Sequence, residues 1–275
     1  MFISPMLLHK SDEPFDDSGY LTELKLDGIR LIYSVGPDGK VRLYTRHKNE
    51  VTARFPELHA ADLPPDTILD GELIVSDSEG KPDFEAMMSR FMSRRDDRYA
   101  TPVHFVAFDI LRYKGEDVRK QPLLVRKAFL ADALPEDTDV ISKVRYIEGN
   151  GPAYYDVIKS QALEGIVLKR KDSHYETGKR SHSWLKVVNY RYDDVFIVGY
   201  RKKEFGLALT FGDGRYAGVM ELGVSPEVRR QMYRTPTVKE SKGFAYFDKP
   251  IGVRVKCRNL TKSGLLRLPS FVEFA

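Results

Sequence analysis

The first two thirds of the chain combine two hydrophobic periodicities. Segments in which apolar and polar residues alternate, the pattern of a half-buried strand, predict β-strands at residues 20–26, 29–35, 41–46, 67–75 and 103–111. Segments with apolar residues at three- and four-residue spacing predict helices at residues 83–92, 122–134 and 151–163. Asp38-Gly39 indicates a tight hairpin between two strands, because glycine tolerates a positive φ. We therefore expect an α+β domain of mainly antiparallel sheets with flanking helices.

The pattern changes after about Asn189, where short strands alternate with glycine-containing turns and one helical segment, residues 225–233. Such a series of short strands with one helix suits a small all-β OB-fold domain, although another small barrel would give a similar pattern. We place the boundary so that the domains are residues 1–189 and 190–275.

The chain has 275 residues and a single cysteine, Cys257, which excludes an internal disulfide and cannot alone supply a thiolate zinc site. A reducing compartment fits, so the cytoplasm is the expected location. Residues 1–8 are apolar but few, and they include Pro5 and run into polar sequence, so we expect no signal peptide. No run approaches the roughly 20 apolar residues that span a bilayer, so we expect no membrane partner.

Charge is distributed unevenly along the chain. The net charge is +4, but residues 192–275 hold 15 Lys and Arg against 9 Asp and Glu. A basic C-terminal third suits a module that contacts phosphates. A well-solvated surface would explain an excess of this size equally well.

Familiar phosphate-binding and metal-binding patterns are missing. No P-loop pattern occurs, and residues 212–218 have the wrong spacing for a dinucleotide fingerprint, so we expect a hairpin turn there. His174 and His182 are expected to be ordinary polar loop residues, because the spacings of zinc ligands are absent. Any nucleotide chemistry must therefore use a different arrangement.

The most informative segment runs from Glu23 to Arg30. Strand alternation places Leu24 and Leu26 on the core face, so Glu23 and Lys25 share the opposite face at the end of the strand. Gly28, within the segment, lets the chain turn sharply and approach a ligand closely, and Arg30 offers a forked donor for phosphate or ribose oxygens. Taken alone, the segment could equally be the charged surface of a hairpin.

Lys25-Leu26-Asp27-Gly28-Ile29-Arg30 resembles the nucleotidyl-lysine motif Lys-x-Asp-Gly-x-Arg of the covalent nucleotidyltransferase superfamily, which comprises DNA ligases, RNA ligases and mRNA capping enzymes. Further segments match the family's motifs in the same order across nearly the whole chain. They are Thr45-Arg46, Leu69-Asp70-Gly71-Glu72-Leu73, Phe108 at the aromatic position, Glu164-Gly165-Ile166-Val167-Leu168-Lys169 and Trp184-Leu185-Lys186. Each has an ordinary alternative, with Asp70-Gly71 as a turn, Phe108 as a core aromatic and Glu164-Gly165 as a helix end. Their shared order favours the family.

The resemblance implies a nucleotidyltransferase (adenylation) domain followed by an OB-fold domain, and a reaction in three steps. Lys25 takes AMP from ATP, the AMP passes to the 5′-phosphate at a nick, and the adjoining 3′-OH displaces it. The residues implied to act on the nucleotide are Glu23, Lys25, Arg30, Arg46, Glu72, Phe108, Lys169 and Lys186, with Phe108 stacked on the purine. Glu72 and Glu164 are implied to bind Mg²⁺ or Mn²⁺, directly or through water.

Lys25 must attack the α-phosphorus as a free amine. Lys169, Lys186 and a bound metal ion would disfavour another positive charge beside them and so favour that amine. The same cations would neutralise charge on the phosphorus and on the leaving pyrophosphate.

Basic residues are expected to contact phosphates of the DNA backbone without reading its sequence. They are Arg46, Arg201, Lys202, Lys203, Arg254, Lys256 and Arg258. The alternative for those of the second domain is a set of strand edges protected by charge.

Two further segments resemble bacterial ligases of the non-homologous end-joining type, namely Pro5-Met6-Leu7 and Gly264-Leu265-Leu266-Arg267-Leu268-Pro269-Ser270-Phe271. We therefore expect a monomeric DNA ligase of the bacterial cytoplasm or nucleoid that acts on nicked or broken duplex DNA, with end-joining repair proteins as partners. An RNA ligase, a capping-type nucleotidyltransferase and a non-catalytic nucleic-acid-binding OB module stay open as alternatives.

The sequence departs from the family pattern in two places. The fifth motif usually has lysines two residues apart, but here Lys186 is followed by Val187 and Val188. Many DNA ligases also carry a C-terminal Arg-x-Asp-Lys element that orients the β- and γ-phosphates, for which Arg267 would substitute only in part. With fewer cations around the triphosphate, we expect AMP attachment to be the slow step.

Overall fold

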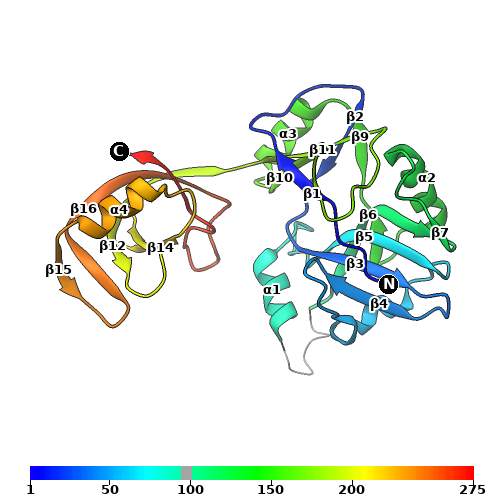
Figure 1. Ribbon diagram of the computed structural model, residues 1–275, viewed down its shortest axis with the longest axis horizontal. Coiled ribbons are helices and arrows are strands. Elements are labelled where there is room, and N and C mark those ends of the chain that lie inside the picture. Colours follow the sequence, from blue (N-terminus) through cyan, green and yellow to red (C-terminus); the bar gives the residue numbers. More distant parts are fainter. Residues whose placement is uncertain (94–100) are drawn as a thin grey trace. The chain divides into compact units, whose positions relative to one another are not determined.

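The structure is a computed structural model that describes residues 1–93 and 101–275. The chain folds as two compact units, Met1–Val188 and Asn189–Ala275 (Figure 1). The sequence-based boundary lies one residue from this division. Within the described residues, no helix has both the length and the apolar character that a membrane crossing would need.

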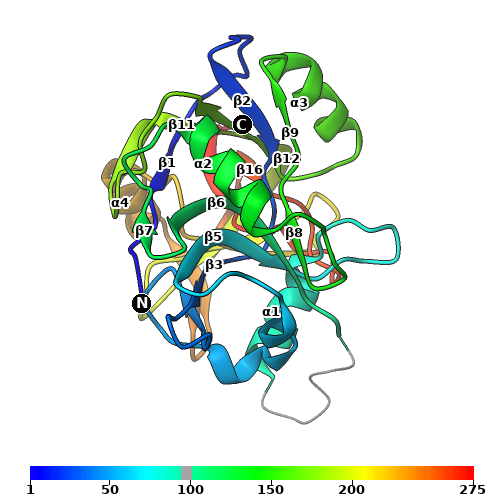
Figure 2. The ribbon, with the colours of Figure 1, turned by 90° about the vertical axis from the view of Figure 1, so that its right-hand side faces the viewer.

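Unit 1, residues 1–188, contains two sheets (Figures 1 and 2). The first sheet has the order β1-β11-β10-β2-β9, with β1 (Leu7–Lys10), β2 (Tyr20–Leu24), β9 (Tyr146–Glu148), β10 (Gly165–Arg170) and β11 (Arg180–Val188). The second has the order β4-β3-β5-β6-β7, with β8 beside β6. Its strands are β3 (Ile29–Val35), β4 (Val41–Thr45), β5 (Thr67–Ile74), β6 (His104–Tyr113), β7 (Glu116–Asp117) and β8 (Ile141–Lys143). Apart from the parallel pairs β1–β11 and β6–β8, neighbouring strands are antiparallel.

The helices of unit 1 are α1 (Phe84–Met92), α2 (Leu123–Ala133) and α3 (Gly151–Ser160), with the 3-10 helices η1 (Thr52–Arg54) and η2 (Pro56–Ala60). The helices predicted in the segments of α1 and α2 are confirmed, and Asp83 caps α1 by accepting the N–H of Ala86 at 2.9 Å. The helix predicted at residues 151–163 ends earlier, at Ser160, because Ala162 adopts a left-handed φ of 56° that a helix cannot contain.

Three apolar cores give unit 1 its layers. The inner core lies between the two sheets and includes Leu21 and Trp184 of the first sheet, and Ile32 and Phe108 of the second. One outer core lies on the other face of the first sheet, where the side chains of α3 pack against β10. A larger outer core covers the other face of the second sheet with residues from α1, η2 and α2. Both faces of both sheets are therefore packed.

One expectation at the nucleotidyl-lysine motif is wrong in detail, and the alternative of a turn at Asp70-Gly71 is excluded. The strand predicted at residues 20–26 ends at Leu24, so Leu24 packs with the outer core beneath α3, while Leu26 packs against the inner core. Asp70-Gly71 is not a turn, because both residues lie inside β5. Gly28 makes its close approach to the chain itself, since a Cβ there would stand 2.2 Å from the carbonyl oxygen of Leu73.

A β-bulge in the second sheet lies at the aromatic motif residue. Asp70 pairs with Asp109 while Gly71 pairs with Ala107, which leaves Phe108 as the extra residue of β6. A bulge re-aims side chains and changes which face they share. Phe108 follows Val106 into the inner core by ordinary strand alternation, and the bulge changes the phase beyond it, so that Ile110 returns to the outer core.

Unit 2, residues 189–275, is a strongly bent antiparallel sheet with one described helix, α4 (Pro226–Arg234). Its strands are β12 (Arg191–Arg201), β13 (Leu207–Thr210), β14 (Tyr216–Met220), β15 (Thr237–Glu240), β16 (Phe244–Cys257) and β17 (Ser270–Phe274). The strands pair in the order β14-β13-β12-β16, and β17 pairs with β16. A single parallel bridge from Leu222 to Ser270 returns β17 to the end of β14.

Turns and the helix of unit 2 follow the sequence pattern. The predicted helix at residues 225–233 is confirmed as α4, and Ser225 caps it by accepting the N–H of Val228 at 3.3 Å. Residues 211–215 link β13 to β14, which confirms the hairpin expected at residues 212–218. In unit 1, by contrast, His182 is not a loop residue, because it lies in β11 and its ring stacks on that of His9 at 3.7 Å.

Candidate active site

The inner face of the first sheet carries motif residues in rows. Residues paired directly across antiparallel strands place their side chains on the same face. The rows are Leu21–Lys169–Trp184, Glu23–Val167–Lys186 and Lys25–Gly165–Val188. The third row begins just beyond β2, where the N–H of Lys25 donates to the carbonyl of Gly165 at 2.9 Å. Because Leu21 and Trp184 belong to the inner core, the rows face the second sheet.

The inner face of the second sheet supplies the other motif residues. Asp70 pairs across the strands with Ile32, an inner-core residue, and Glu72 pairs with Arg30. Phe108, which alternates with Ala107 on β6, lies on the same face. Segments far apart in the sequence thus bring the nucleotidyl-lysine, third, aromatic, fourth and fifth motifs to one layer between two sheets.

Lys25 has a carboxylate as its direct neighbour. Its Nζ lies 2.7 Å from Oε2 of Glu164, the residue immediately before β10, and the two side chains are 18% and 9% exposed. Lys169, which was expected to act on Lys25 as a neighbouring cation, pairs with Glu23 in this arrangement. The Lys25–Glu164 pair must therefore open before Lys25 can act as a nucleophile.

Glu23 is buried beneath two lysines. Lys127 Nζ lies 2.5 Å from Oε1, and Lys169 Nζ lies 2.6 Å from Oε2. Burial disfavours the charged carboxylate, but the two ammonium groups outweigh it and hold the pKa of Glu23 below its ordinary value. Glu23 was expected to face the nucleotide, and here it faces cations of the protein.

Lys169 is held between aromatic rings as well as by Glu23. Its Nζ lies 4.3 Å from the ring centre of Phe108 and 4.2 Å from that of Trp184. Burial lowers the pKa of Lys169 to about 8, with Glu23 opposing that shift and Lys127 adding to it. Lys169 is therefore a cation that the protein stabilises only in part.

Arg30 is oriented by a buried carboxylate. Its guanidinium donates to both oxygens of Asp70 at 2.5 Å and to the carbonyl of Met6 at 3.2 Å. Tyr175 donates its hydroxyl to Asp70 at 2.5 Å and accepts the N–H of Met6 at 3.0 Å. Burial works against the charge of Arg30, but Asp70 outweighs it and raises the Arg30 pKa. The guanidinium also lies 4.5 Å from the ring centre of Phe108.

Phe108 is consequently covered in this structure. The side chain is 9% exposed, and the cations of Arg30 and Lys169 both lie over its ring. The ring of Trp184 meets it edge-on at 6.3 Å. Stacking on a purine stays a prediction, and it would require the cations to move from the ring face that the base takes.

Burial in this layer destabilises the charged form of the Glu72 carboxyl group. Burial raises the pKa of Glu72 to about 7, the positive charges of Lys25 and Arg30 oppose the shift, and Glu164 and Asp70 add to it. A carboxylate in such a place binds a cation readily, because the cation removes the penalty of its charge.

Two residues of the predicted set are placed differently from the rest. Arg46 lies exposed in the turn after β4, outside the inner layer. Lys186 lies in the Glu23 row and is partly buried. Val188, where the family has its second fifth-motif lysine, lies in the row of Lys25 and is 7% exposed.

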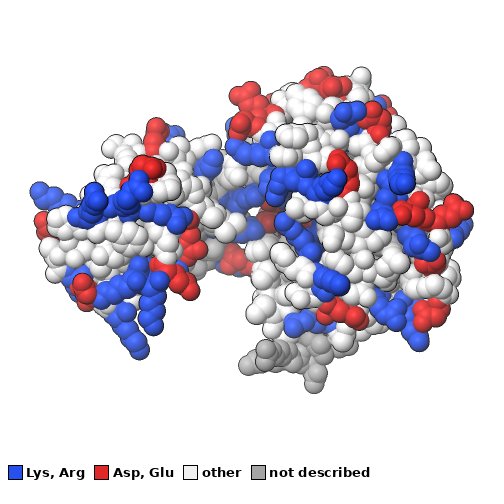
Figure 3. Space-filling view, in the orientation of Figure 1, with Lys and Arg blue, Asp and Glu red and all other residues white. Residues whose placement is uncertain are grey.

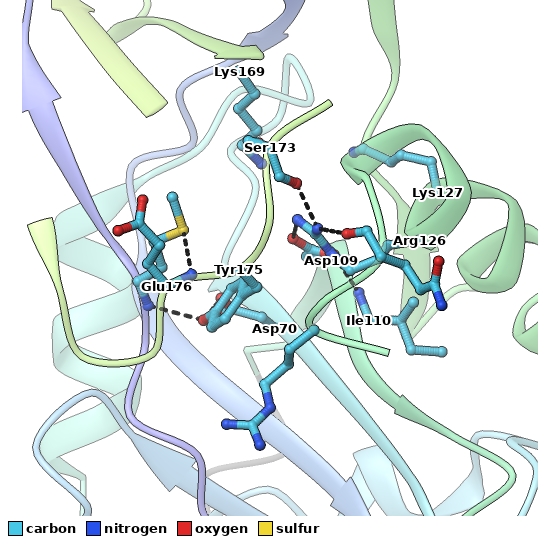
Figure 4. A network of polar contacts seen from close by, with 12 residues as sticks. Asp70, Asp109, Ile110, Arg126, Lys127, Lys169, Ser173, Tyr175 and Glu176 are labelled. Carbon is cyan, nitrogen blue, oxygen red and sulfur yellow. Dashed lines mark hydrogen bonds and ion pairs between the residues drawn. The ribbon is translucent and has the colours of Figure 1, made fainter. Parts of the chain in front are cut away.

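The sequence did not single out Arg126, Lys127 or Tyr175. Arg126 donates to both oxygens of Asp109 at 2.8 Å, and neither side chain is exposed (Figure 4). It also donates to the carbonyls of Gln121 and Ser173. A usable signal did exist, because charged residues at positions 126 and 127 interrupt the apolar face of a predicted helix. Their partners could not be read from it, since those lie 17 and 104 residues away.

The basic residues of unit 2 form two groups with different surroundings. Arg201 pairs with Glu221 at 2.8 Å and with Glu204 at 3.6 Å, and Lys202 pairs with Glu240 at 2.5 Å. These glutamates compensate the charge, which fits a solvated surface. Lys203, the third member of this group, is exposed.

The second group comprises two residues of β16, Arg254 and Lys256, and Arg258 directly after the strand. Arg254, Lys256 and Arg258 alternate with buried residues, as a strand with one solvent face requires. Lys256 and Arg258 lie 5.1 and 5.3 Å from the ring centre of Tyr190, and Arg254 lies 5.9 Å from that of Tyr192. Further basic side chains gather over α4 on the face of unit 2 drawn in Figure 3.

Known proteins resemble this chain over the segments that hold these motifs. Residues 5–187 match the family described as ATP dependent DNA ligase domain. The chain is 47% identical over 271 residues to the SPbeta prophage-derived DNA ligase-like protein LigB of Bacillus subtilis, and the match covers 98% of each chain. It is 34% identical over 238 residues to the multifunctional non-homologous end joining protein LigD of Pseudomonas aeruginosa, covering 84% of this chain and 26% of LigD.

Solved structures agree with this assignment. The ligase domain of LigD from M. tuberculosis, and mycobacterial DNA ligase D complexed with ATP and MES, each match with a TM-score of 0.61 and 28% identity. Each match covers 99% of this chain and 95% of the other. The family match over most of unit 1 and the relative that is similar along nearly the full length lead to one conclusion: the chain belongs to the family of ATP-dependent DNA ligases and is an enzyme of that class.

Proposed function

We propose that this ligase seals nicks or breaks in duplex DNA through AMP carried covalently on Lys25. The observation that carries the proposal is the position of Lys25 in the inner layer. Its ammonium pairs with Glu164 at 2.7 Å, and its charge acts on the buried carboxyl of Glu72. A reactive lysine beside carboxylates, with Lys169 and Arg30 in the same layer, suits transfer of a phosphoryl group.

The first step forms a bond from Lys25 Nζ to the α-phosphorus of ATP and breaks the bond to the bridging oxygen of pyrophosphate. The ammonium gives up one proton before the attack and a second one after it, and pyrophosphate leaves with the electrons of the broken bond. Lys169 and Arg30, which already carry positive charge in this layer, would meet the phosphate oxygens. Because their charge is fixed in place before reaction, it favours the transition state over the ground state.

In the second step a 5′-phosphate oxygen of the DNA attacks the same phosphorus, and the bond to Lys25 breaks. In the third step the 3′-OH attacks the 5′-phosphorus, loses its proton and displaces AMP. One phosphate-binding layer can serve all three steps, because each passes through a phosphorus with developing negative charge.

Glu72 and Glu164 fit a divalent metal ion such as Mg²⁺. Within the described residues, no group of three or more His, Cys, Asp or Glu side chains could enclose a metal. Two carboxylates nevertheless suit Mg²⁺, which commonly keeps several waters and takes further oxygens from substrate phosphates. When bound, the ion would supply charge neutralisation at the phosphates. Glu72, whose pKa is raised to about 7, would hold it best above neutral pH.

We infer that unit 2 is an OB-fold. Support comes from its strand path, since β12, β13, β14, β17 and β16 pair in a nearly closed circuit, with α4 between β14 and β16. A partly open, five-stranded barrel of this kind is the OB architecture, whose surfaces commonly bind nucleic acids. The β16 face with Arg254, Lys256 and Arg258 is the better candidate for DNA phosphates than the Arg201 group, because glutamates do not pair with Arg254 or Lys256 within the described residues.

The likeness to LigD supports DNA end joining as the biological setting, so breaks with ligatable ends are the substrate that we propose. The decisive experiment compares the intact chain with its Lys25→Ala variant. We expect the variant to lose AMP attachment and the sealing of an ordinary nick, yet to close a nick that already carries 5′-AMP. Sealing of the ordinary nick by Lys25→Ala would contradict the proposal.

A further inference from the structure

Two consecutive residues of α2 connect the helix with different sheets. Arg126 binds Asp109 on β6 of the second sheet (Figure 4). Lys127 binds Glu23 on β2 of the first sheet. Successive residues of a helix point about 100° apart, so neighbours can reach two walls of one layer. Because Arg126 is fully buried and makes four hydrogen bonds, the position of Lys127 is closely defined.

The charges around Glu23 do not cancel. Lys127, Glu23 and Lys169 are 4%, 2% and 3% exposed, so two ammonium groups share one carboxylate away from water. Each lysine takes its own oxygen, at 2.5 and 2.6 Å. A buried group with one uncompensated positive charge is unfavourable unless an anion joins it.

The two lysines differ in what else holds them. Lys127 is fixed to α2, and its second neighbour is the ring of Tyr146 at 5.1 Å. Within the described part of the chain, the further neighbours of the Lys169 ammonium are the ring faces of Phe108 and Trp184, and burial lowers its pKa to about 8. Of the pair, Lys169 is the one whose ammonium gains more from an incoming phosphate.

We propose that Lys127 is a positioning residue that neutralises Glu23 and so leaves the ammonium of Lys169 available for a nucleotide phosphate. Lys127 lies in none of the segments that match the family motifs. The inference rests on the proposed function only in taking a nucleoside triphosphate as the ligand of this layer. It predicts that, without Lys127, the carboxylate of Glu23 claims Lys169 for itself.

A double-mutant cycle tests the proposal with the full-length chain. Wild type, Lys127→Met, Glu23→Gln and the double variant are compared for binding of α,β-methylene-ATP with Mg²⁺ by calorimetry. This analogue cannot be cleaved at the bond that Lys25 would break. We expect Lys127→Met to weaken binding roughly tenfold, the scale of one charge-assisted hydrogen bond. In the Glu23→Gln background the same change should alter affinity by less than about twofold, because no carboxylate is left to neutralise.

Two further variants separate positioning from general stability. Lys127→Arg should restore most of the affinity, since it keeps the charge. Lys171→Met removes another lysine of unit 1 that pairs with a glutamate, Glu148 at 2.6 Å, and should leave the affinity unchanged. If Lys127→Met does not fold, as thermal unfolding would reveal, Lys127→Gln takes its place in the cycle.

Equal loss of affinity in both Glu23 backgrounds would overturn the proposal, and so would an unchanged affinity of the Lys127 variant. AMP attachment to the wild-type chain is measured separately. Its absence would remove Lys25 as the nucleotide carrier, while the binding cycle would still decide the role of Lys127.

Discussion

Lys25 and Lys169 are lysines of one layer that have different surroundings. Lys25 meets a carboxylate at the rim of the layer and is 18% exposed, whereas Lys169 lies 3% exposed between two aromatic rings. Burial without full compensation makes the charge of Lys169 costly. The same cost would favour phosphate binding to Lys169. The negative charge of a phosphate would stabilise the buried ammonium, as water stabilises an exposed one.

The pH dependence of stability should report on Lys169. The folded pKa of about 8 lies below the ordinary 10.5, so between these values the unfolded chain binds more protons at this residue than the folded chain does. The free energy of unfolding contributed by Lys169 must therefore rise as pH increases from 8 to 10.5. Urea unfolding of wild type and Lys169→Met across this range should show wild type gaining stability relative to the variant. Parallel curves for the two proteins would contradict the shift, and Lys171→Met serves as the exposed-pair control.

Phe108 provides a test of base stacking. Phe108→Leu keeps much of the buried volume but removes the aromatic face, so ATP binding should weaken by on the order of 1 to 3 kcal/mol, the scale of base–aromatic stacking. Phe105→Leu is the matched control, because Phe105 lies on the same strand but in the outer core. Titration of both variants with ATP decides the matter. Equal affinities would place Phe108 in the core alone.

At this scale the sequence predicted the motif residues better than their partners. Arg30, Glu72, Phe108 and Lys169 were found because their spacing matches a family pattern, and the structure brings all four to the inner layer. Asp70 was assigned to a strand and to a family motif but not recognised as the partner of Arg30, and Lys127 was not singled out at all. Ion pairs across 104 residues depend on how two sheets pack, which local periodicity does not encode.

Among the elements, long strands were predicted most reliably. The strand at residues 29–35 agrees with β3 at both ends, because its alternation extends over the whole length. The strand at residues 20–26 was drawn too long, since β2 ends at Leu24 and one backbone hydrogen bond from Lys25 to Gly165 follows it. Short β1 and β9 were not predicted, because three or four residues are too few to show a period of two.

Val188 occupies the position of the missing fifth-motif lysine, and it lies in one row with Lys25 and Gly165. Strands are about 4.8 Å apart, so position 188 stands roughly 10 Å from the Lys25 backbone on the same face. Val188→Lys should therefore add a cation on the triphosphate side and accelerate AMP attachment, provided the buried charge does not unfold the protein. Single-turnover labelling of wild type and variant with ATP gives the two rates. Val187→Lys is the control, because residue 187 belongs to the outer core, and a gain there instead would contradict the row.

The same reasoning concerns the order of the steps. With fewer cations around pyrophosphate, AMP attachment should be slower than closure of a nick that already carries 5′-AMP, since closure releases no pyrophosphate. Faster attachment than closure in single-turnover experiments would refute this expectation.

For the whole molecule, the chain folds as two compact units, and we propose that unit 1 carries the nucleotide chemistry and unit 2 contacts DNA. The change to short strands and glycine-containing turns near residue 189 predicted the second unit. It did not predict which of the unit's basic groups is neutralised by glutamates. That distinction depends on strand pairing, because Glu221 and Glu240 come from other parts of the unit.

DNA binding by unit 2 should distinguish the two basic groups. Arg254→Ala with Lys256→Ala should weaken nick binding and lower the slope of log affinity against log salt by about 2, roughly 0.9 for each lost phosphate contact. Arg201→Ala with Lys202→Ala is the matched pair and should change the slope less, because glutamates already compensate those charges. AMP attachment should be the same in both. A larger effect of the Arg201 pair would assign DNA contact to the opposite group.

The central claim is that Lys25 carries AMP, and intact-mass measurement tests it most directly. The purified 275-residue chain is incubated with ATP and Mg²⁺, its mass is recorded, and the modified peptide is sequenced. We predict that the mass of the chain rises by one AMP, that this AMP is located on Lys25, and that the Lys25→Ala variant lacks it. An unchanged mass of active protein, or AMP found on another residue, would contradict it.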